Sequence, residues 1–190
     1  MEGFYFEDKI FDKINFTQTA FQTGAYEGCQ FVNCNFSNCN LSNSNFSECI
    51  FTGCNLSMAA LIKTSFQDTK FKDCKMLGLH FHDCNHFLFT VDFDNCSLNV
   101  SSFYKLRLKK IQFKNSSLYD VDFTEADLTD AVFDNSDLAM ATFDNTILEK
   151  TNFVSSYNFS IDPEKNKMKK AKFPASGLAG LLDKYGIIIE

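Results

Sequence analysis

The sequence of 190 residues contains no tryptophan, only 2 prolines and 8 glycines. Proline and glycine make up about 1% and 4% of the chain, below the usual levels of roughly 5% and 7%, which excludes collagen-like and low-complexity structure. No apolar run reaches the roughly 18 residues of a membrane-spanning helix, and the N-terminus lacks the basic segment and apolar stretch of a secretion signal. We therefore expect a cytoplasmic protein with no membrane partner.

Basic residues are also scarce. The chain has 18 Lys and Arg against 24 Asp and Glu, which gives a net charge of −6. Binding to a phosphate backbone depends on clustered Lys and Arg, so we expect no direct nucleic-acid partner. Hydrophobic residues make up 45% of the chain, which is enough to build a core.

The sequence has a period of five. From Phe6 to Phe81 every fifth residue is large and apolar, and after a shift of two positions near 82–88 the pattern runs from Leu88 to Phe153 with Leu and Phe alternating. A spacing of five fits neither the helical period of 3.6 nor the strand period of 2. The chain must therefore turn once in every repeat, and each repeat is expected to be a short strand and a turn stacked on its neighbours.

The position two before each large residue is usually small, and both should face inward because residues two apart on an extended segment point the same way. All eight cysteines occupy this small position: Cys29, Cys34, Cys39, Cys49, Cys54, Cys74, Cys84 and Cys96. Ala, Ser, Thr and Val replace cysteine at the same position elsewhere. We therefore interpret the cysteines as small core residues and expect no disulfide, metal or other cofactor.

These repeats resemble the pentapeptide-repeat family, whose pattern is A(D/N)LXX with a central Leu or Phe. Cys34-Asn35-Phe36-Ser37-Asn38 and Ala126-Asp127-Leu128-Thr129-Asp130 fit this pattern closely. The resemblance implies an all-β fold, a right-handed, four-sided parallel β-helix with four repeats in each coil. Residues 1–153 would form this β-helix, with a register slip near 82–88.

Stacking every twentieth residue agrees with four sides, because it places like residues on like. Leu88, Leu108, Leu128 and Leu148 fall in one column. The phenylalanines expected to form the structural core fall in two others: Phe11, Phe31, Phe51 and Phe71, then Phe93, Phe113, Phe133 and Phe153.

Residues 154–190 depart from the repeat and are expected to form a distorted last coil, a short α-helix and a terminal strand. The helix would follow Pro174 and end at Gly186, and the strand would be Ile187–Ile189. This tail is expected to cap the last coil, to form a homodimer contact, or both. The candidate dimer interface consists of Leu178, Leu181, Leu182, Tyr185, Ile187 and Ile189.

The register slip contains His80, His82, Cys84 and His86. The two histidines beside inward Phe81 should face solvent while Cys84 faces the core, so their donor atoms should diverge and no metal site is expected. Phe87 and Phe89 flank Leu88 and form a candidate exposed contact patch.

Acidic residues concentrate between Ser116 and Glu149, where there are nine Asp and Glu and no Lys or Arg before Lys150. One interpretation is ordinary solvation of a rigid surface. The other is an acidic surface that competes for a positive DNA-binding groove on a partner protein. The candidate residues are Asp120, Asp122, Asp127, Asp130 and Asp137.

No catalytic constellation is apparent, and we expect a protein that is not an enzyme. The resemblance is to the quinolone-resistance type of the family, dimeric rods that bind DNA gyrase and topoisomerase IV and protect them from fluoroquinolones. This chain departs from that type in having no long loop projecting from its coils apart from Val154 to Lys167. The alternative is a general interaction scaffold with an unrelated protein partner.

Overall fold

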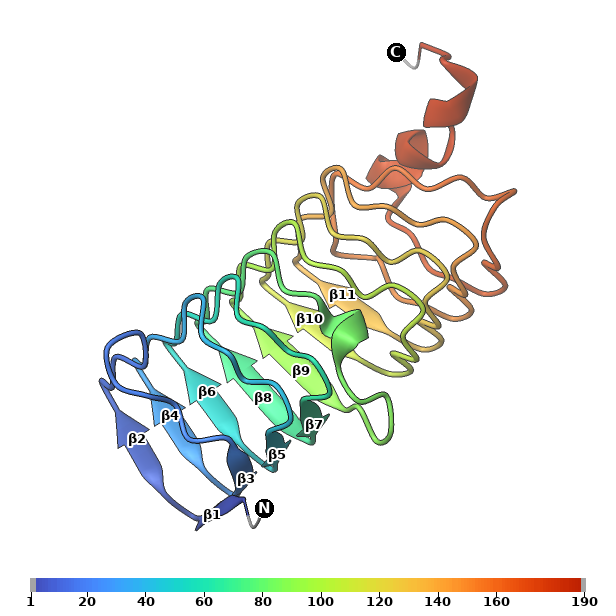
Figure 1. The fold of residues 1–190 in the computed structure, drawn as a ribbon. Helices are drawn as coiled ribbons and strands as arrows, with labels where there is room; N and C mark the ends of the chain where they lie inside the picture. The colour runs from blue at the N-terminus through green and yellow to red at the C-terminus, as the bar shows by residue number, and fades with distance from the viewer. Residues whose placement is uncertain (1–2, 189–190) are drawn as a thin grey trace.

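The computed structural model describes residues 3–188, which form a parallel β-solenoid of about seven turns (Figure 1). Each strand pairs in parallel with the strand one coil further along the chain, for example Phe11 with Phe31 and Phe113 with Phe133. The expected coil of four repeats is therefore confirmed, and so is the all-β solenoid.

The regular elements are short because each coil turns after every repeat. The strands are β1 (Phe4–Glu7), β2 (Ile10–Asp12), β3 (Gly24–Glu27), β4 (Gln30–Val32), β5 (Asn45–Ser47), β6 (Ile50–Thr52), β7 (Ser65–Gln67), β8 (Thr69–Lys72), β9 (Val91–Asp94), β10 (Gln112–Lys114) and β11 (Val132–Asp134). Three short helices are of the 3-10 type: η1 (Phe81–Asp83), η2 (Ala175–Leu181) and η3 (Asp183–Tyr185).

The strands and bridges define four faces, in the order in which the chain visits them. Face 1 holds β1, β3, β5 and β7, and face 2 holds β2, β4, β6, β8, β9, β10 and β11. Face 3 is held by single bridges such as Asn35 with Asn55, and face 4 by bridges such as Ser102 with Asp122.

Corners between faces use the left-handed backbone conformation. Asn38, Asn43 and Asn135 lie there with φ of 59°, 61° and 48°. Asparagine tolerates this conformation better than most side chains, which accounts for its abundance in the repeats. Val100 adopts a φ of 61° in the same role, which is unfavourable for a β-branched residue.

A column of phenylalanines runs through the inside of face 2. Its ring centroids are between 4.5 and 5.4 Å apart, within the range of offset stacking. The members are Phe11, Phe31, Phe51, Phe71, Phe93, Phe113, Phe133, Phe153 and Phe173. The sequence predicted one phenylalanine column before the register slip and another after it. In the structure the two form a single column that continues across the slip.

The small inward position has a hydrogen-bonding role as well as a packing role. The Cys54 thiol lies 3.2 Å from the Phe31 carbonyl oxygen, and the Thr146 hydroxyl donates to the Phe123 carbonyl at 2.9 Å. In both cases the carbonyl belongs to the preceding coil. A thiol or hydroxyl at this position can therefore give a buried carbonyl group an additional hydrogen bond, as at Phe123, whose carbonyl also accepts from the Ala126 amide.

The register slip lengthens one coil by two positions, because Thr69 of β8 pairs with Val91 of β9. We call segment 69–90 the long coil. The expectation that Leu88 faces inward and Phe89 outward is wrong. Leu88 is 53% exposed with a φ of 54°, whereas Phe89 is 8% exposed and its ring packs against those of Phe66 and Phe81. The inward phenylalanine is favoured because it fills the face 1 position above Phe66.

The C-terminal end is covered by helices of the 3-10 type, which corrects the expected α-helix. The Gly177 amide donates to the Pro174 carbonyl and the Leu182 amide to the Ala179 carbonyl, both three positions back. Gly180 allows η2 to approach closely, since a Cβ there would collide with the Phe159 carbonyl group, and its own carbonyl accepts a bond from the Ile161 amide at 2.9 Å. Helix η2 thus closes over the last coil.

The expected terminal strand Ile187–Ile189 does not form over its described residues. Ile187 and Ile188 are exposed and lie outside any strand, and Ile189 falls outside the described residues. None of the helices in the described part of the chain combines the length and the apolar character needed to cross a membrane.

Candidate protein-interaction surface

The five candidate acidic residues lie within one coil but on different sides of the rod. Bridges place Asp122 on face 4, Asp127 on face 1 and Asp137 on face 3. Asp120 and Asp130 have φ of 55° and 58° and occupy two of the corners. The coil therefore distributes these carboxylates around its circumference and does not gather them on one face.

Three of these carboxylates also hold the local turns. Oδ1 of Asp122, Asp127 and Asp137 accepts a bond from the backbone amide two positions later, at 2.9 to 3.1 Å. This bond fixes the turn that follows each inward Leu or Phe. An asparagine can make the same bond, which explains why Asp and Asn alternate at this repeat position.

We call the coil of residues 120–137, which contains the five candidate aspartates, the acidic coil. Lysines in adjacent coils lie beside it. Lys109 Nζ is 3.2 Å from an Asp127 carboxylate oxygen, and Lys105 Nζ is 3.5 Å from one of Glu125. Partial burial disfavours ionisation of Asp127, but the bonds from Thr129 and the Lys109 ammonium outweigh it and lower the pKa of this carboxyl group.

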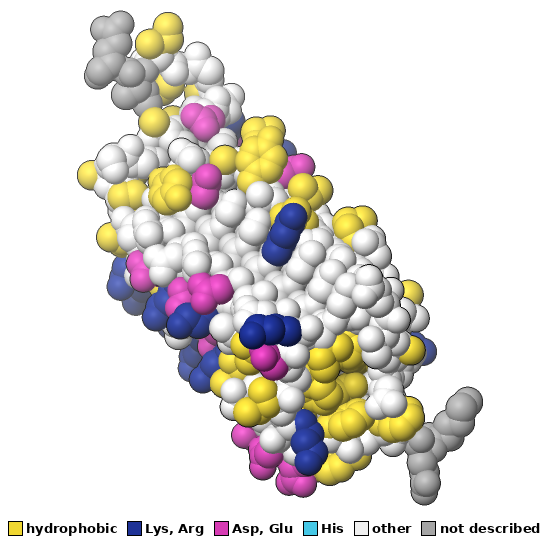
Figure 2. All heavy atoms as spheres, turned by 90° about the vertical axis from the view of Figure 1, so that its left-hand side faces the viewer, with side chains coloured by type: hydrophobic (Ala, Val, Ile, Leu, Met, Phe, Trp, Pro, Cys, Tyr) yellow, Lys and Arg dark blue, Asp and Glu magenta, His cyan; other side chains and the backbone are white. Residues whose placement is uncertain are grey.

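The corner between faces 1 and 2 places Asp130 between lysines, with Lys110, Asp130, Lys150 and Lys170 at successive coils. On the side drawn in Figure 2, acidic and basic side chains are likewise interspersed along one edge. The acidic run in the sequence is therefore bordered in space by basic residues from the coils on either side.

The long coil projects a loop from the rod, seen in green in Figure 1. The Phe87 side chain is 75% exposed, and its amide is held by Asn85 Oδ1 at 3.1 Å. We call Phe87 and Leu88 the loop tip. Two adjacent exposed apolar residues on an otherwise polar loop form a candidate contact point, but Phe89 is not part of it.

Most of the C-terminal candidates are accessible to solvent. Leu178, Leu182 and Tyr185 are exposed, as is Ile187 after η3, and Leu181 is half-buried. The Lys184 ammonium lies 2.7 Å from carboxylate oxygens of both Asp162 and Glu164, and its hydrogen bonds lower the pKa of both carboxyl groups. These ion pairs tie η3 to the part of the last coil that contains Asp162 and Glu164, and they leave the apolar side chains of the tail accessible.

The eight cysteines are free and buried. Burial raises the pKa of the Cys49 thiol to about 12 and that of Cys84 further, which keeps both thiols protonated. Because a thiolate is the form that binds metals and acts as a nucleophile, these two thiols are poor candidates for either role.

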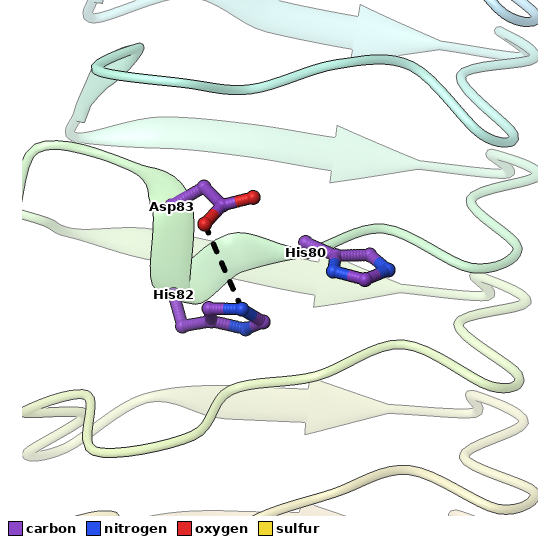
Figure 3. Close-up of side chains that lie close together, drawn as sticks. All are labelled: His80, His82 and Asp83. Atoms are coloured by element: carbon purple, nitrogen blue, oxygen red, sulfur yellow. Dashed lines mark ion pairs between the residues drawn. The ribbon is translucent and has the colours of Figure 1, made fainter.

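The exposure of the histidines agrees with the prediction, but the predicted divergence of their donor atoms does not. His80 is exposed and His82 half-buried, while Cys84 is buried. However, His80, His82 and Asp83 do converge, with candidate ligand atoms within 4.8 Å of one another (Figure 3). The sequence pattern places alternate residues outside but contains no signal for the η1 turn that brings Asp83 beside the histidines.

Two family models match the chain. The model described as a pentapeptide repeat region matches residues 25–90 and 44–123, and the model described as pentapeptide repeats, 8 copies, matches residues 116–153. A search of curated proteins finds no match.

Solved structures share the fold at low identity. A trypsin-treated variant of QnrB1, a plasmid-mediated fluoroquinolone resistance protein, superposes with a TM-score of 0.60 at 21% identity, covering 99% of this chain and 92% of that one. HetL, a pentapeptide-repeat protein involved in heterocyst differentiation regulation in the cyanobacterium Nostoc sp. strain PCC 7120, has a TM-score of 0.60 at 15% identity, covering 90% and 86%. With the family models matching most of the coils, this chain belongs to the pentapeptide-repeat family.

Proposed function

We propose that this protein is a non-catalytic interaction rod that binds a type II topoisomerase, DNA gyrase or topoisomerase IV, and protects it from fluoroquinolones. The observation that carries the proposal is the shape match over nearly the whole chain to a fluoroquinolone resistance protein. Pentapeptide-repeat proteins are generally non-catalytic, in keeping with this role.

The proposed contact is electrostatic and involves the coil that contains Asp120, Asp122, Asp127, Asp130 and Asp137. A topoisomerase holds DNA in a positive groove, and a rigid rod with carboxylates on several sides can enter such a groove whichever side it presents. The net charge of −6 supports attraction to that groove.

The loop tip is proposed as a second contact. Phe87 and Leu88 project from the middle of the rod, where an apolar side chain can enter a pocket of the partner and be desolvated there. A homodimer formed through Leu178, Leu182, Tyr185 and Ile187 would present two rods to a two-fold symmetric partner.

The test is equilibrium binding of the purified chain to purified gyrase, for example by biolayer interferometry. Replacing the five aspartates by asparagine removes the charge and keeps the turn-forming acceptor of Asp122, Asp127 and Asp137. We expect this variant to fold normally and to bind at least tenfold more weakly, with the salt dependence reduced.

A matched control replaces five exposed carboxylates elsewhere, Glu7, Asp12, Glu48, Asp68 and Asp73, by their amides. It has the same net charge and should retain binding. Equal weakening in both variants would contradict a specific role for the acidic coil, and no binding by the unmodified chain would contradict the proposal as a whole.

A second candidate function is a scaffold for an unrelated protein. The lysines beside the acidic coil favour it, since Lys105, Lys109 and Lys150 offset part of its charge. If gyrase and topoisomerase IV do not bind, the scaffold becomes the better account.

A further inference from the structure

The outside of the long coil carries a cluster of metal-binding side chains. His80, His82 and Asp83 belong to η1 and the residue before it, and each offers a ligand atom within 4.8 Å of the others. In Figure 3 both imidazole rings project from the same side of the turn, with the Asp83 carboxylate directed toward His82. The ring centroids of the two histidines are 5.2 Å apart.

Hydrogen bonds to the next coil determine which nitrogen of His82 is free. The Ser102 hydroxyl lies 3.2 Å from Asp122 Oδ2 and 3.1 Å from His82 Nδ1. A carboxylate can only accept, so the single Ser102 proton is donated to Asp122, and His82 must donate from Nδ1 to the Ser102 oxygen. In the neutral imidazole the lone pair is therefore on Nε2.

The free nitrogen faces the carboxylate. His82 Nε2 is 3.6 Å from Asp83 Oδ1, so a lone pair and a negative oxygen confront each other in the neutral form of the ring. A cation bound at this point would contact both atoms. Metal-binding histidines commonly donate their other ring nitrogen to a nearby oxygen, as His82 does to Ser102.

We propose that His80, His82 and Asp83 bind one divalent transition-metal ion of the zinc type. Two imidazoles and one carboxylate supply three ligands of a tetrahedral site, and water supplies the fourth. Ligand atoms on such an ion are roughly 3.4 Å apart, given metal–ligand distances of about 2.1 Å. The His82–Asp83 pair is already near that separation, and exposed His80 can rotate to complete the set.

The donor set discriminates between classes of cation. Imidazole nitrogen favours zinc, nickel, copper and cobalt, whereas magnesium and calcium favour oxygen ligands alone. The eight cysteines do not compete in the folded protein because they are buried. His86 is not among the three residues whose candidate ligand atoms lie within 4.8 Å of one another.

Binding would fasten the turn that precedes the loop tip. His80, His82 and Asp83 are close in sequence, so an ion shared by them restricts the backbone of η1. The long coil departs from the regular period by two residues, and the ion would reinforce this coil.

The experiment is a titration of the metal-free chain with Zn²⁺ by calorimetry and with Co²⁺ by absorption spectroscopy. We expect one ion per chain, d–d bands of a nitrogen and oxygen site, and a rise in Tm with zinc. His80→Ala and His82→Ala should each weaken binding at least tenfold, and Ser102→Ala roughly tenfold through the loss of the outer hydrogen bond.

His86→Ala is the matched control, a histidine of the same coil outside the cluster, and should bind as the unmodified chain does. His80 is exposed, so its replacement does not disturb the core. Absence of binding at micromolar zinc would overturn the proposal and leave a histidine–aspartate ion pair. Unchanged affinity in the His80 and His82 variants, or a thiolate-to-cobalt charge-transfer band, would overturn it as well.

Discussion

The two ends of the solenoid share one coil geometry but differ in how the terminal coil is covered. In the first coil Phe6, Phe11, Phe16 and Phe21 are only partly buried. At the other end Phe159 is 5% exposed, beneath η2. The comparison teaches that stacking protects the interior coils equally, whereas the outermost coil needs an additional element to bury its apolar side chains.

The chemistry of the small inward position also changes along the rod. All eight cysteines precede Ser97, and from Ser101 to Ser156 the position holds Ser, Thr, Ala or Val, except for the larger Leu106 and Ile111. Thiol and hydroxyl donors contact equivalent carbonyl groups, as Cys54 and Thr146 show. The geometry of the coil therefore favours a small residue there, and a donor such as Cys54 or Thr146 can reach a carbonyl group, although the Ser44 hydroxyl has no partner among the described residues.

The largest expected effect comes from the phenylalanine column. Phe133 is fully buried between Phe113 and Phe153, at centroid distances of 5.0 and 4.9 Å, so Phe133→Ala should cost about 3–5 kcal/mol of unfolding free energy. Phe11 stacks on Phe31 and is half-buried, so Phe11→Ala should cost less than half as much. Urea unfolding measures both, and equal losses would contradict the difference between interior and end.

The next effect concerns the C-terminal covering. In Gly180→Ala the new methyl group would collide with the Phe159 carbonyl group and displace η2, at a cost of about 1–3 kcal/mol. Hydrogen exchange of the Ile161 amide should speed up because its bond to the Gly180 carbonyl is lost. Gly186→Ala meets no atom within 4 Å, and the strain from its φ of 59° falls at the end of η3, so Ile161 should stay protected. An unchanged exchange rate in the Gly180 variant would show that η2 does not depend on this contact.

A smaller effect tests the donors at the inward position. Thr146→Val removes the hydroxyl bonded to the Phe123 carbonyl and keeps the shape, so we expect a loss of about 1–2 kcal/mol. The buried Ser44 hydroxyl has no partner among the described residues, and Ser44→Ala should be neutral or slightly stabilising. Thermal unfolding distinguishes the two, and a neutral Thr146 variant would refute the hydrogen-bonding role.

The smallest effect is a gain. Val100 has a φ of 61° and an exposed side chain, so Val100→Asn should stabilise the protein by about 0.5–1 kcal/mol. Val154 is also exposed but has no left-handed backbone, and Val154→Asn should bring no gain. Thermal unfolding of the Val100→Asn and Val154→Asn variants checks this prediction. If both variants are stabilised, the gain comes from the added polar group and not from the left-handed backbone of residue 100.

The stripe of large residues at every fifth position predicts a chain that turns once in every repeat, whereas the four-sided coil is what the resemblance to the pentapeptide-repeat family implies and the like-on-like columns favour. The exception is the register slip, where Phe87, Leu88 and Phe89 are all apolar and the pattern cannot decide which faces inward. The pairing of Thr69 with Val91 decides it, and that pairing depends on contacts between successive coils.

The surroundings of the candidate acidic residues were harder to predict from the sequence than the fold. In the linear sequence the carboxylates form an uninterrupted acidic run. In the coil, residues twenty positions apart become neighbours, so Lys110 and Lys150 lie on either side of Asp130. The signal was present in the sequence, since stacking every twentieth position puts those lysines in the column of Asp130. The cluster of His80, His82 and Asp83 had no such signal, because it results from a 3-10 turn inserted at an irregular coil.

The measurement that tests the functional account most directly is supercoiling of relaxed plasmid by purified gyrase, with this protein titrated in and with a fluoroquinolone present or absent. The account predicts that supercoiling lost to the drug is restored as the protein is added. No change at micromolar protein, or inhibition without any protection from the drug, would contradict it.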